Sequence, residues 1–306
     1  MDTLLVTGAA GFIGAAIAKK LLEEGNKVIT IDNLSTGFRS NIPDGVEFIE
    51  GDCQDAGVYK DLEDLKIDGI FHIAGQSSGE ISFENPVYDL QTNAQSTLLL
   101  LKLALKTNCK NFLYASTMSV YGDKPDQPID ENAALKPKSF YGVGKIASEH
   151  YLRIYQEYGI NSTALRLFNV YGPGQNMKNL KQGMVSIFLA QALENGHIHV
   201  KGSADRFRDF VYIDDVVRGF LTAYKSNNAG FRYYNVATGI RTTIKELISN
   251  MKLYIPEDIS VEYSGSTPGD QFGIYSSIEK IKKELNWSPL VDLNSGLKIM
   301  VNSELN

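Results

Sequence analysis

The stretch TGAAGFIG (residues 7–14) determines how the chain begins to fold. It follows a short apolar run, LLV (4–6), and leads into FIGAAIAKKLLEEG (12–25), whose apolar residues recur at helical spacing. Gly8 and Gly11 allow a tight turn and close approach to the backbone, whereas Gly14 allows the helix to pack on a sheet. The stretch therefore predicts a strand, a turn and a helix whose N-terminus can hold a pyrophosphate.

The next predicted strand, KVITID (27–32), ends in an acidic residue, Asp32. A carboxylate at this position can accept hydrogen bonds from both hydroxyls of an adenosine ribose, and it repels a 2′-phosphate. NAD is therefore favoured over NADP. The alternative, in which the glycines only allow a tightly packed turn between strand and helix, is disfavoured by the position of Asp32. Asp52, after the third predicted strand, could bond an adenine amino group or cap a helix, and both interpretations stay open.

Strand and helix signals alternate through the first half of the chain. Predicted strands follow at 46–52, 69–75, 111–116 and 162–168, with a long helix after Pro86 and another from about Ser139 to Tyr158. Alternation of this kind predicts an α/β fold with a doubly wound, parallel, Rossmann-like sheet.

Beyond Asn169 the alternation loosens. A Gly- and Asn-rich loop (171–183) precedes a predicted helix at about 184–195 and a strand at 197–202, and 209–224 is expected to return to the first lobe as strand plus helix. Helices near 241–251 and 277–285 suggest a smaller C-terminal α/β lobe. We therefore predict a dinucleotide-binding domain (1–168 plus about 209–235) and a substrate lobe (about 169–208 and 236–306).

Composition narrows the partners and the compartment. The net charge of −6 and the pI near 5.4 favour neither nucleic acid nor an anionic membrane. The longest apolar run, LLLLKLAL (98–105), is too short to span a bilayer, and no signal peptide is expected. Cys53 and Cys109 have no metal-ligand spacing, so we expect reduced thiols of a cytoplasmic protein.

The histidines favour structural roles. His72 at a strand end is expected to be structural rather than catalytic. His197 and His199 alternate on a predicted strand, and alone they do not predict a metal site.

The helix from about Ser139 carries Tyr141 and Lys145, which share one face at i and i+4. A free tyrosine has a pKa of about 10 and is a poor base at neutral pH, but a nearby ammonium favours the phenolate. Gly142 and Gly144 weaken the helix, which suggests that something approaches its backbone closely. Taken alone, Tyr141 and Lys145 could be a surface pair. Together with the glycine loop they predict a catalytic site.

Several motifs together carry a resemblance that covers essentially the whole chain. They are TGAAGFIG, DNLSTG (32–37), HIAGQ (72–76), AST (115–117), YGVGK (141–145), RLFNVYGPGQ (166–175), RDFVYIDDVV (208–217) and ELNWSP (284–289). The chain resembles the extended short-chain dehydrogenase/reductase family, and within it nucleotide-sugar epimerases of the UDP-glucose 4-epimerase type.

The resemblance implies NAD as cofactor and a nucleotide-diphosphate sugar as substrate, bound by the smaller lobe. Tyr141 would be the general acid/base, Lys145 would hold the nicotinamide ribose and lower the tyrosine's pKa, and Thr117 would bond the same sugar oxygen. The expected cofactor contacts are Gly8, Gly11, Phe12, Ile13, Gly14, Asp32, Asn33, Asp52, Cys53, Ala74, Gly75, Asn93, Tyr141, Lys145 and Phe168. The expected substrate contacts are Thr117, Asn169, Arg206, Arg208 and Asp270.

The positions after Thr117 bear on the reaction. Family members that dehydrate or decarboxylate their sugars place an acid there, whereas this chain has Met118 and Ser119, which cannot move a proton at neutral pH. Epimerisation, with C4 as the expected carbon, needs only reversible hydride transfer and one base. A ketoreductase of the same fold is the rival interpretation, and a non-catalytic dinucleotide sensor is a third.

Two features leave alternatives open. In SGSTPGDQ (264–271) Thr267 stands where many relatives have an arginine on the second phosphate, and Arg206 is the candidate replacement. If so, Arg206→Ala should weaken nucleotide-sugar binding severalfold. The apolar segment 85–106 and the helix carrying Tyr141 could form the helix bundle of a homodimer, as in the family, or be buried within one subunit.

Overall fold

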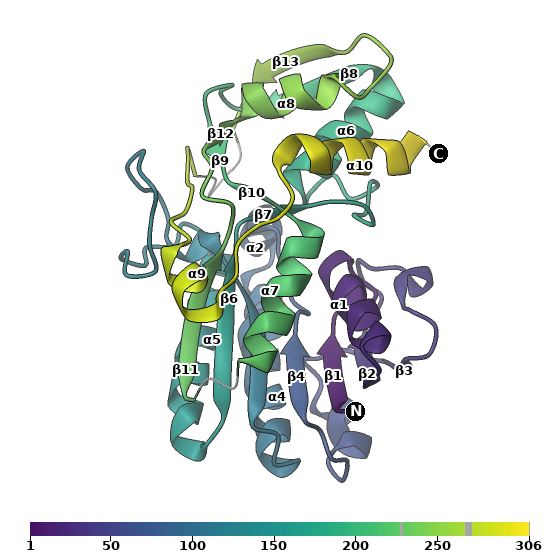
Figure 1. Ribbon diagram of the computed structural model, residues 1–306, viewed down its shortest axis with the longest axis vertical. Coiled ribbons are helices and arrows are strands. Elements are labelled where there is room, and N and C mark those ends of the chain that lie inside the picture. Colours follow the sequence, from purple (N-terminus) through teal and green to yellow (C-terminus); the bar gives the residue numbers. More distant parts are fainter. Residues whose placement is uncertain (227–228, 267–270, 306) are drawn as a thin grey trace.

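The computed structural model describes residues 1–226, 229–266 and 271–305, and its larger lobe is built on one parallel sheet (Figure 1). The sheet has seven strands in the order β11-β6-β5-β4-β1-β2-β3. In chain order they are β1 Thr3–Thr7, β2 Lys27–Asp32, β3 Glu47–Glu50, β4 Gly69–His72, β5 Asn111–Thr117, β6 Asn161–Leu167 and β11 Phe231–Val236. The predicted doubly wound α/β fold is confirmed.

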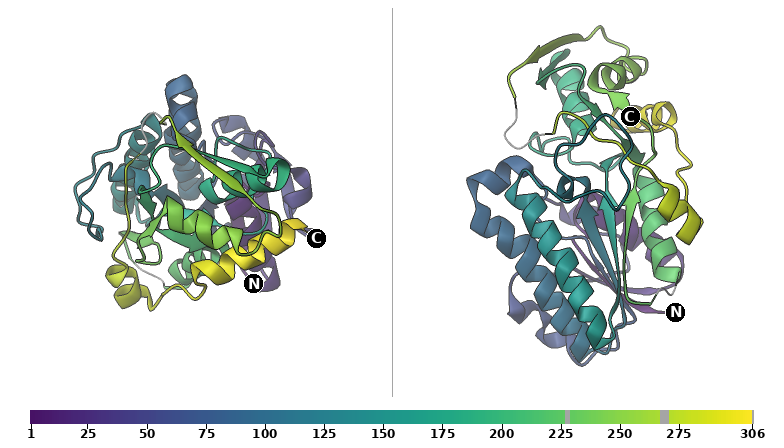
Figure 2. Two further views of the ribbon diagram at one scale, coloured as in Figure 1. Left: turned by 90° about the horizontal axis from the view of Figure 1, so that it is seen from above. Right: turned by 90° about the vertical axis from the view of Figure 1, so that its left-hand side faces the viewer.

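Helices cover both faces of this sheet (Figure 2). Helices α1 (Phe12–Glu23) and α7 (Ile213–Lys225) pack together on one face, and α4 (Ser96–Lys106) and α5 (Phe140–Tyr155) pack together on the other. Successive strand residues point to opposite faces, so Val6 joins one core and Leu5 the other. Because both faces of the central strands are buried, these strands are rich in apolar residues.

The long helix predicted after Pro86 is interrupted. It consists of α3 (Pro86–Leu90), a π-helical turn (Gln91–Gln95) and α4. Side-chain hydroxyls of Thr92 and Ser96 donate to carbonyls four residues earlier, at 3.0 and 2.6 Å. Such bonds and the extra residue of the turn bend the helix, and Asn93 lies in the turn, fully buried.

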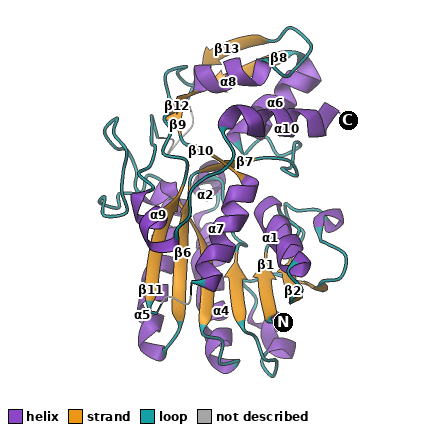
Figure 3. Cartoon of the chain, viewed as in Figure 1, coloured by secondary structure: helices purple, strands orange, loops and turns teal. Residues whose placement is uncertain are grey.

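The smaller lobe lies over the carboxyl end of the sheet (Figure 3). It contains α6 (Met184–Asn195), α8 (Ile244–Lys252) and α10 (Leu293–Leu305). Three strand pairs accompany them: β7 Asn169–Tyr171 with β10 Phe210–Tyr212, β9 Phe207–Arg208 with β12 Thr242–Thr243, and β8 His197–Lys201 with β13 Ser260–Ser264. A short helix, α2 (Gly79–Glu84), precedes α3.

One segment packs differently from the expectation. Helix α9 (Glu279–Leu285), which we expected in the smaller lobe, lies against β11 of the large sheet. Its Lys280 ammonium lies 3.9 Å from the centre of the Tyr233 ring, and Glu284 accepts a hydrogen bond from Tyr234 at 2.8 Å. These two contacts hold the helix on the edge strand. None of the helices formed by the described residues has the length and apolar character needed to cross a membrane.

Candidate active site

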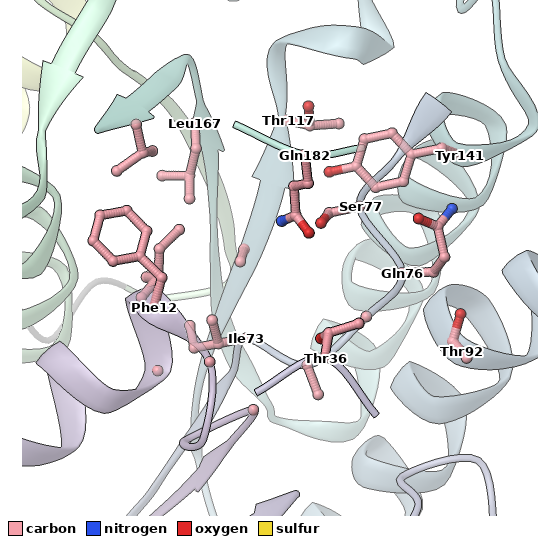
Figure 4. Close-up of a pocket in the computed structure, with 18 of the residues that line it drawn as sticks. Phe12, Thr36, Ile73, Gln76, Ser77, Thr92, Thr117, Tyr141, Leu167 and Gln182 are labelled. Carbon is pink, nitrogen blue, oxygen red and sulfur yellow. The ribbon is translucent and has the colours of Figure 1, made fainter. Parts of the chain in front are cut away.

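A cleft of about 490 Å³ opens where the carboxyl ends of the central strands meet the smaller lobe (Figure 4). The glycine loop and Asp32 line one end, and Thr117, Tyr141 and Lys145 line the other. Ligands of doubly wound folds bind at this edge of the sheet, so the fold places the predicted site residues where such a site is expected.

Gly8 and Gly14 of the glycine loop are packed so closely that neither position has room for a side chain. Gly8 has φ +76°, and a Cβ on it would come 2.8 Å from the Ala74 amide nitrogen. A Cβ on Gly14 would lie 2.1 Å from the Gly8 carbonyl oxygen. Helix α1 begins at Phe12 with no side-chain cap and no acidic residue in its first turn, so its first N–H groups suit a pyrophosphate.

Asp32 is held at the end of β2 by two backbone amides. Its carboxylate accepts from Ala10 N at 2.9 Å and from Leu34 N at 2.8 Å. Each carboxylate oxygen has capacity for a further bond, and the residue lines the cleft, so it fits an adenosine ribose.

The neighbouring polar residues also line this end of the cleft. Asn33 donates to Asp52 at 2.8 Å, and Asp52 also accepts from Gln54 N at 3.0 Å. The nearby 3-10 helix Ala56–Leu62 is capped by Asp55, so the cap interpretation of Asp52 is wrong for this helix. Burial raises the pKa of the Cys53 thiol to about 12, which keeps it protonated.

His72 orients the backbone beside the cofactor end. The Thr7 hydroxyl oxygen accepts from Ile73 N and Ala74 N, both at 3.1 Å, and therefore donates to His72 Nδ1 at 2.9 Å. His72 Nε2 then carries the proton and donates to Ser96 Oγ at 3.2 Å. Burial holds the pKa of His72 well below its usual range, and its two hydrogen bonds fit a structural role.

The three predicted catalytic residues come together from two elements. Thr117 ends β5, and Tyr141 and Lys145 lie one turn apart near the start of α5, which Ser139 caps by accepting from Gly142 N at 3.2 Å. The Lys145 ammonium donates to the Ala115 carbonyl at 2.9 Å and lies 5.7 Å from the centre of the Tyr141 ring.

The helix glycines are explained by close packing of the protein on itself. A Cβ on Gly142 would lie 2.9 Å from the Ser119 carbonyl oxygen. A Cβ on Gly144 would lie 3.4 Å from the Asn93 Cβ. The start of α5 therefore lies directly on the turn after Thr117 and on the π-helical turn.

Burial dominates the electrostatics of Tyr141 and Lys145. It raises the pKa of Tyr141 to about 12, a hydrogen bond with Thr117 lowers it in part, and the charge of Asp89 raises it. Burial lowers the pKa of Lys145 to about 8, against the opposing charges of Asp89 and Glu149.

Two buried polar networks that the sequence reasoning missed support the catalytic end. Glu149, one turn beyond Lys145, accepts from Ser116 Oγ at 2.6 Å and forms a bidentate pair with Arg166 at 2.9 and 2.7 Å. On the other side, Asp89 accepts from Gln76 at 2.7 Å and from Asn93 at 3.2 Å. The spacing of Lys145 and Glu149 at i and i+4 was the available signal for the first network.

Some of the remaining predicted contact residues line the cleft and others do not. Phe168 and Asn169 line the cleft, and the buried Asn169 Oδ1 has no hydrogen-bond partner among the described residues. Asn93 does not line it but lies behind Gly75, where a Cβ would meet Asn93 Oδ1 at 2.5 Å.

Arg206 and Arg208 are both buried. Arg206 and Arg208 are 9% and 2% exposed, and neither is among the described residues that line the cleft. Arg208 donates to the carbonyls of Phe207 and Gln271 at 2.7 and 2.6 Å. Asp270 and Thr267 lie outside the described residues.

The residues fit one class of protein. A glycine loop at a free helix N-terminus, an acid at the end of β2 and a tyrosine and lysine one turn apart in the same cleft define a dinucleotide-dependent α/β enzyme. Among the described residues, no group of three or more His, Cys, Asp or Glu could hold a metal ion.

Comparison with known proteins makes the assignment narrower. The model of the NAD-dependent epimerase/dehydratase family matches residues 4–237, and the chain belongs to this family. It is 36% identical over 301 residues to a putative UDP-glucose 4-epimerase of Methanocaldococcus jannaschii, covering 98% of this chain and 97% of the relative. It is also 31% identical over 309 residues to UDP-glucuronic acid decarboxylase 1 of Arabidopsis thaliana, covering 97% of this chain and 68% of the relative.

The chain is also similar to solved structures of UDP-glucose 4-epimerases. The UDP-glucose 4-epimerase of Thermotoga maritima, solved with UDP-glucose, superposes with a TM-score of 0.92 at 35% identity, covering 99% of this chain and 98% of that one. The UDP-glucose 4-epimerase of Thermus thermophilus, solved with NAD, gives 0.91 at 32% identity and covers 98% of both chains.

Proposed function

We propose that this protein is an NAD-dependent epimerase of nucleotide-diphosphate sugars. It inverts the configuration at C4 of the sugar, as in the interconversion of UDP-glucose and UDP-galactose, through a transient 4-keto sugar. The chain's similarity to 4-epimerases over nearly its whole length supports this activity. The site supports it independently, because the glycine loop and Asp32 suit NAD and the opposite end of the cleft carries a tyrosine base.

The residues at the end of the cleft that holds Tyr141 favour one reaction over the others. Thr117, Tyr141 and Lys145 line the cleft together with Met118 and Ser119. Elimination or decarboxylation needs an additional acid or base near the ring, and neither Met118 nor Ser119 can supply one at neutral pH. A single tyrosine suffices for reversible oxidation at one carbon, so the site favours epimerisation over the activity of the decarboxylase relative.

The residues divide the work as follows. As the phenolate, Tyr141 takes the proton from the sugar hydroxyl at C4 and becomes the neutral phenol, which later returns the proton to that oxygen, while Thr117 bonds the same oxygen. Tyr141 needs an added positive charge to act as a base near neutral pH, because burial raises its pKa to about 12. When bound, NAD supplies a hydride acceptor and, in its oxidised form, a positive charge. Lys145 would hold the nicotinamide ribose.

The test is direct. Purified protein incubated with UDP-glucose or UDP-galactose should interconvert them, as NMR of the C4 proton would show, without net formation of NADH, and heat should release bound NAD. Tyr141→Phe should lower kcat by at least about 10²-fold. Stoichiometric consumption or release of NADH would instead indicate a ketoreductase, and full turnover by Tyr141→Phe would refute the assigned mechanism.

We also propose that the protein is a homodimer. In the single subunit, apolar side chains of α2, α3 and α5 are exposed to solvent. Among them, the exposed fraction is 62% for Val87, 56% for Leu90 and 54% for Val143. The rings of Phe83 and Phe140 join α2 to α5 at 5.6 Å. Light scattering after size exclusion should give twice the chain mass, and Val143→Lys should give the single mass. A wild-type monomer at micromolar concentration would contradict the proposal.

A cytoplasmic location completes the proposal. Cys53 and Cys109 are both buried and form no disulfide, which suits a reducing compartment. Fractionation of the source cells with an antibody to the protein would test it.

A further inference from the structure

The smaller lobe contributes a wall of amide side chains to the cleft. Asn169, Gln175, Asn179 and Gln182 all line it, and the last three come from the loop between β7 and α6. Figure 4 shows the Gln182 amide reaching into the space between Thr117 and Ser77, with the Tyr141 ring beside it. Gln182 thus faces Thr117 and Tyr141.

The loop is pinned on both sides of the cleft. The Lys181 ammonium pairs with Glu84 of α2 at 2.9 Å, and Asn176 donates to the Thr36 carbonyl at 3.2 Å. Gly183 has φ +88°, and a Cβ on it would lie 2.8 Å from Gln175 Nε2, so the backbone beside Gln182 is set by a position that requires glycine. Asn179 donates to Gln182 Oε1 at 3.4 Å.

The charges in the cleft lie away from this wall. Among the described residues that line it, Asp32, Asp52 and Lys145 are ionisable as acid or ammonium. The two acids are at the cofactor end, and the Lys145 ammonium donates to Ala115. The four residues 267–270 are Thr, Pro, Gly and Asp, which include no cation.

Thr117 and Tyr141 would hold the oxygen at C4, and C5 is bonded to C4, so the substituent at C5 is within reach of the wall that faces these two residues. A carboxylate at that position would lose part of its hydration and meet amide groups rather than a cation among the described residues of this wall, which is costly. A hydroxymethyl group both donates and accepts one hydrogen bond, and a glutamine amide offers both roles.

We propose that Gln182 is a specificity-determining residue that selects nucleotide hexoses with a neutral hydroxymethyl group at C5 over nucleotide hexuronates. The inference rests on the proposed epimerase function, since it names the substrate class of that same site. Gln182 acts on the group at C5 and takes no part in proton transfer.

The experiment compares kcat/KM for UDP-glucose, UDP-glucuronate and UDP-xylose, which has no carbon substituent at C5. Wild-type protein should prefer UDP-glucose to UDP-glucuronate by about 100-fold or more. Gln182→Ala should lower kcat/KM for UDP-glucose about tenfold, the equivalent of one lost hydrogen bond, and leave UDP-xylose unchanged. Gln182→Arg should raise the ratio of UDP-glucuronate to UDP-glucose at least about tenfold.

Leu180→Arg is the matched control, because Leu180 is in the same loop, is 55% exposed and does not line the cleft. It should leave all three rates unchanged. Equal shifts in the ratio from Leu180→Arg and Gln182→Arg would overturn the assignment, and so would an equal loss on UDP-glucose and UDP-xylose in Gln182→Ala. Wild-type turnover of UDP-glucuronate as fast as UDP-glucose would overturn the inference alone, whereas inactivity on every sugar would overturn the proposed function.

Discussion

At the scale of single residues, the buried Lys145 lowers the stability of the folded chain at neutral pH because its ammonium is desolvated. It is 3% exposed, and burial lowers its pKa to about 8 from an ordinary value of 10.5. At pH 7 the lysine is charged in both folded and unfolded chains, and the folded chain bears the desolvation. Between pH 8 and 10.5 the unfolded chain binds the proton and the folded chain does not, so this residue's contribution to the free energy of unfolding rises with pH.

Lys145→Met should therefore stabilise the cofactor-free protein at pH 7 by on the order of 3 kcal/mol, an advantage that shrinks as the pH approaches 10.5. Urea denaturation of both proteins at pH 7 and pH 9.5 measures it. The variant should be inactive throughout. A stability difference that is the same at both pH values would show that the lysine does not titrate in this window.

Gly14 is the second residue with a strong requirement. Because a Cβ would overlap the Gly8 carbonyl oxygen at 2.1 Å, Gly14→Ala must displace α1 or the loop. We expect a loss of about 1–3 kcal/mol in the free energy of unfolding and loss of bound NAD. Gly79→Ala is the control, since its nearest neighbour would be the Ser139 Cβ at 4.0 Å. Retention of NAD by Gly14→Ala, measured after heat release, would contradict the role of the glycine loop.

At the scale of elements, one buried ion pair joins α5 to the strands that carry the site. Glu149 of α5 and Arg166 of β6 have side chains that are each 4% exposed, and Ser116 of β5 bonds the same carboxylate. Glu149→Gln leaves the guanidinium buried without a charged partner and should cost about 3–5 kcal/mol. The double variant Glu149→Leu/Arg166→Met should cost less than the single one, as denaturation with urea would show. A larger loss in the double variant would mean that the pair itself stabilises the fold strongly.

The same scale shows what local patterns can predict. The strands at 69–75 and 111–116 and the helix at 184–195 follow from apolar runs and periodicity within a few residues. The π-helical turn at Gln91–Gln95 does not, because it depends on hydroxyl bonds to the backbone and on Asn93 packing against the segment 75–76. The packing of helix α9 on β11 does not follow from local patterns either, because β11 is distant from α9 in sequence.

At the scale of the whole molecule, the loop that carries Gln182 joins the two lobes over the cleft. The Lys181–Glu84 pair is exposed, with side chains 47% and 55% accessible. Lys181→Ala should therefore change the free energy of unfolding by less than about 1 kcal/mol. It should nevertheless raise KM for UDP-glucose, since the loop loses one of its anchors. Lys178→Ala, in the same loop, is the control, and equal KM values in all three proteins would show that the anchor has no role.

The sequence by itself determined where the glycine loop and Asp32 lie and which tyrosine and lysine we propose as catalytic. These signals are local: three glycines, an acid at the next strand end, and two residues one helical turn apart. Only the tertiary structure decided the burial of those two side chains and the chemistry of the opposite wall. The raised pKa of Tyr141 arises from burial, and the wall arises because 175–182 folds back over Thr117 and Tyr141. Desolvation and contacts between distant segments depend on packing, which spacing along the chain does not encode.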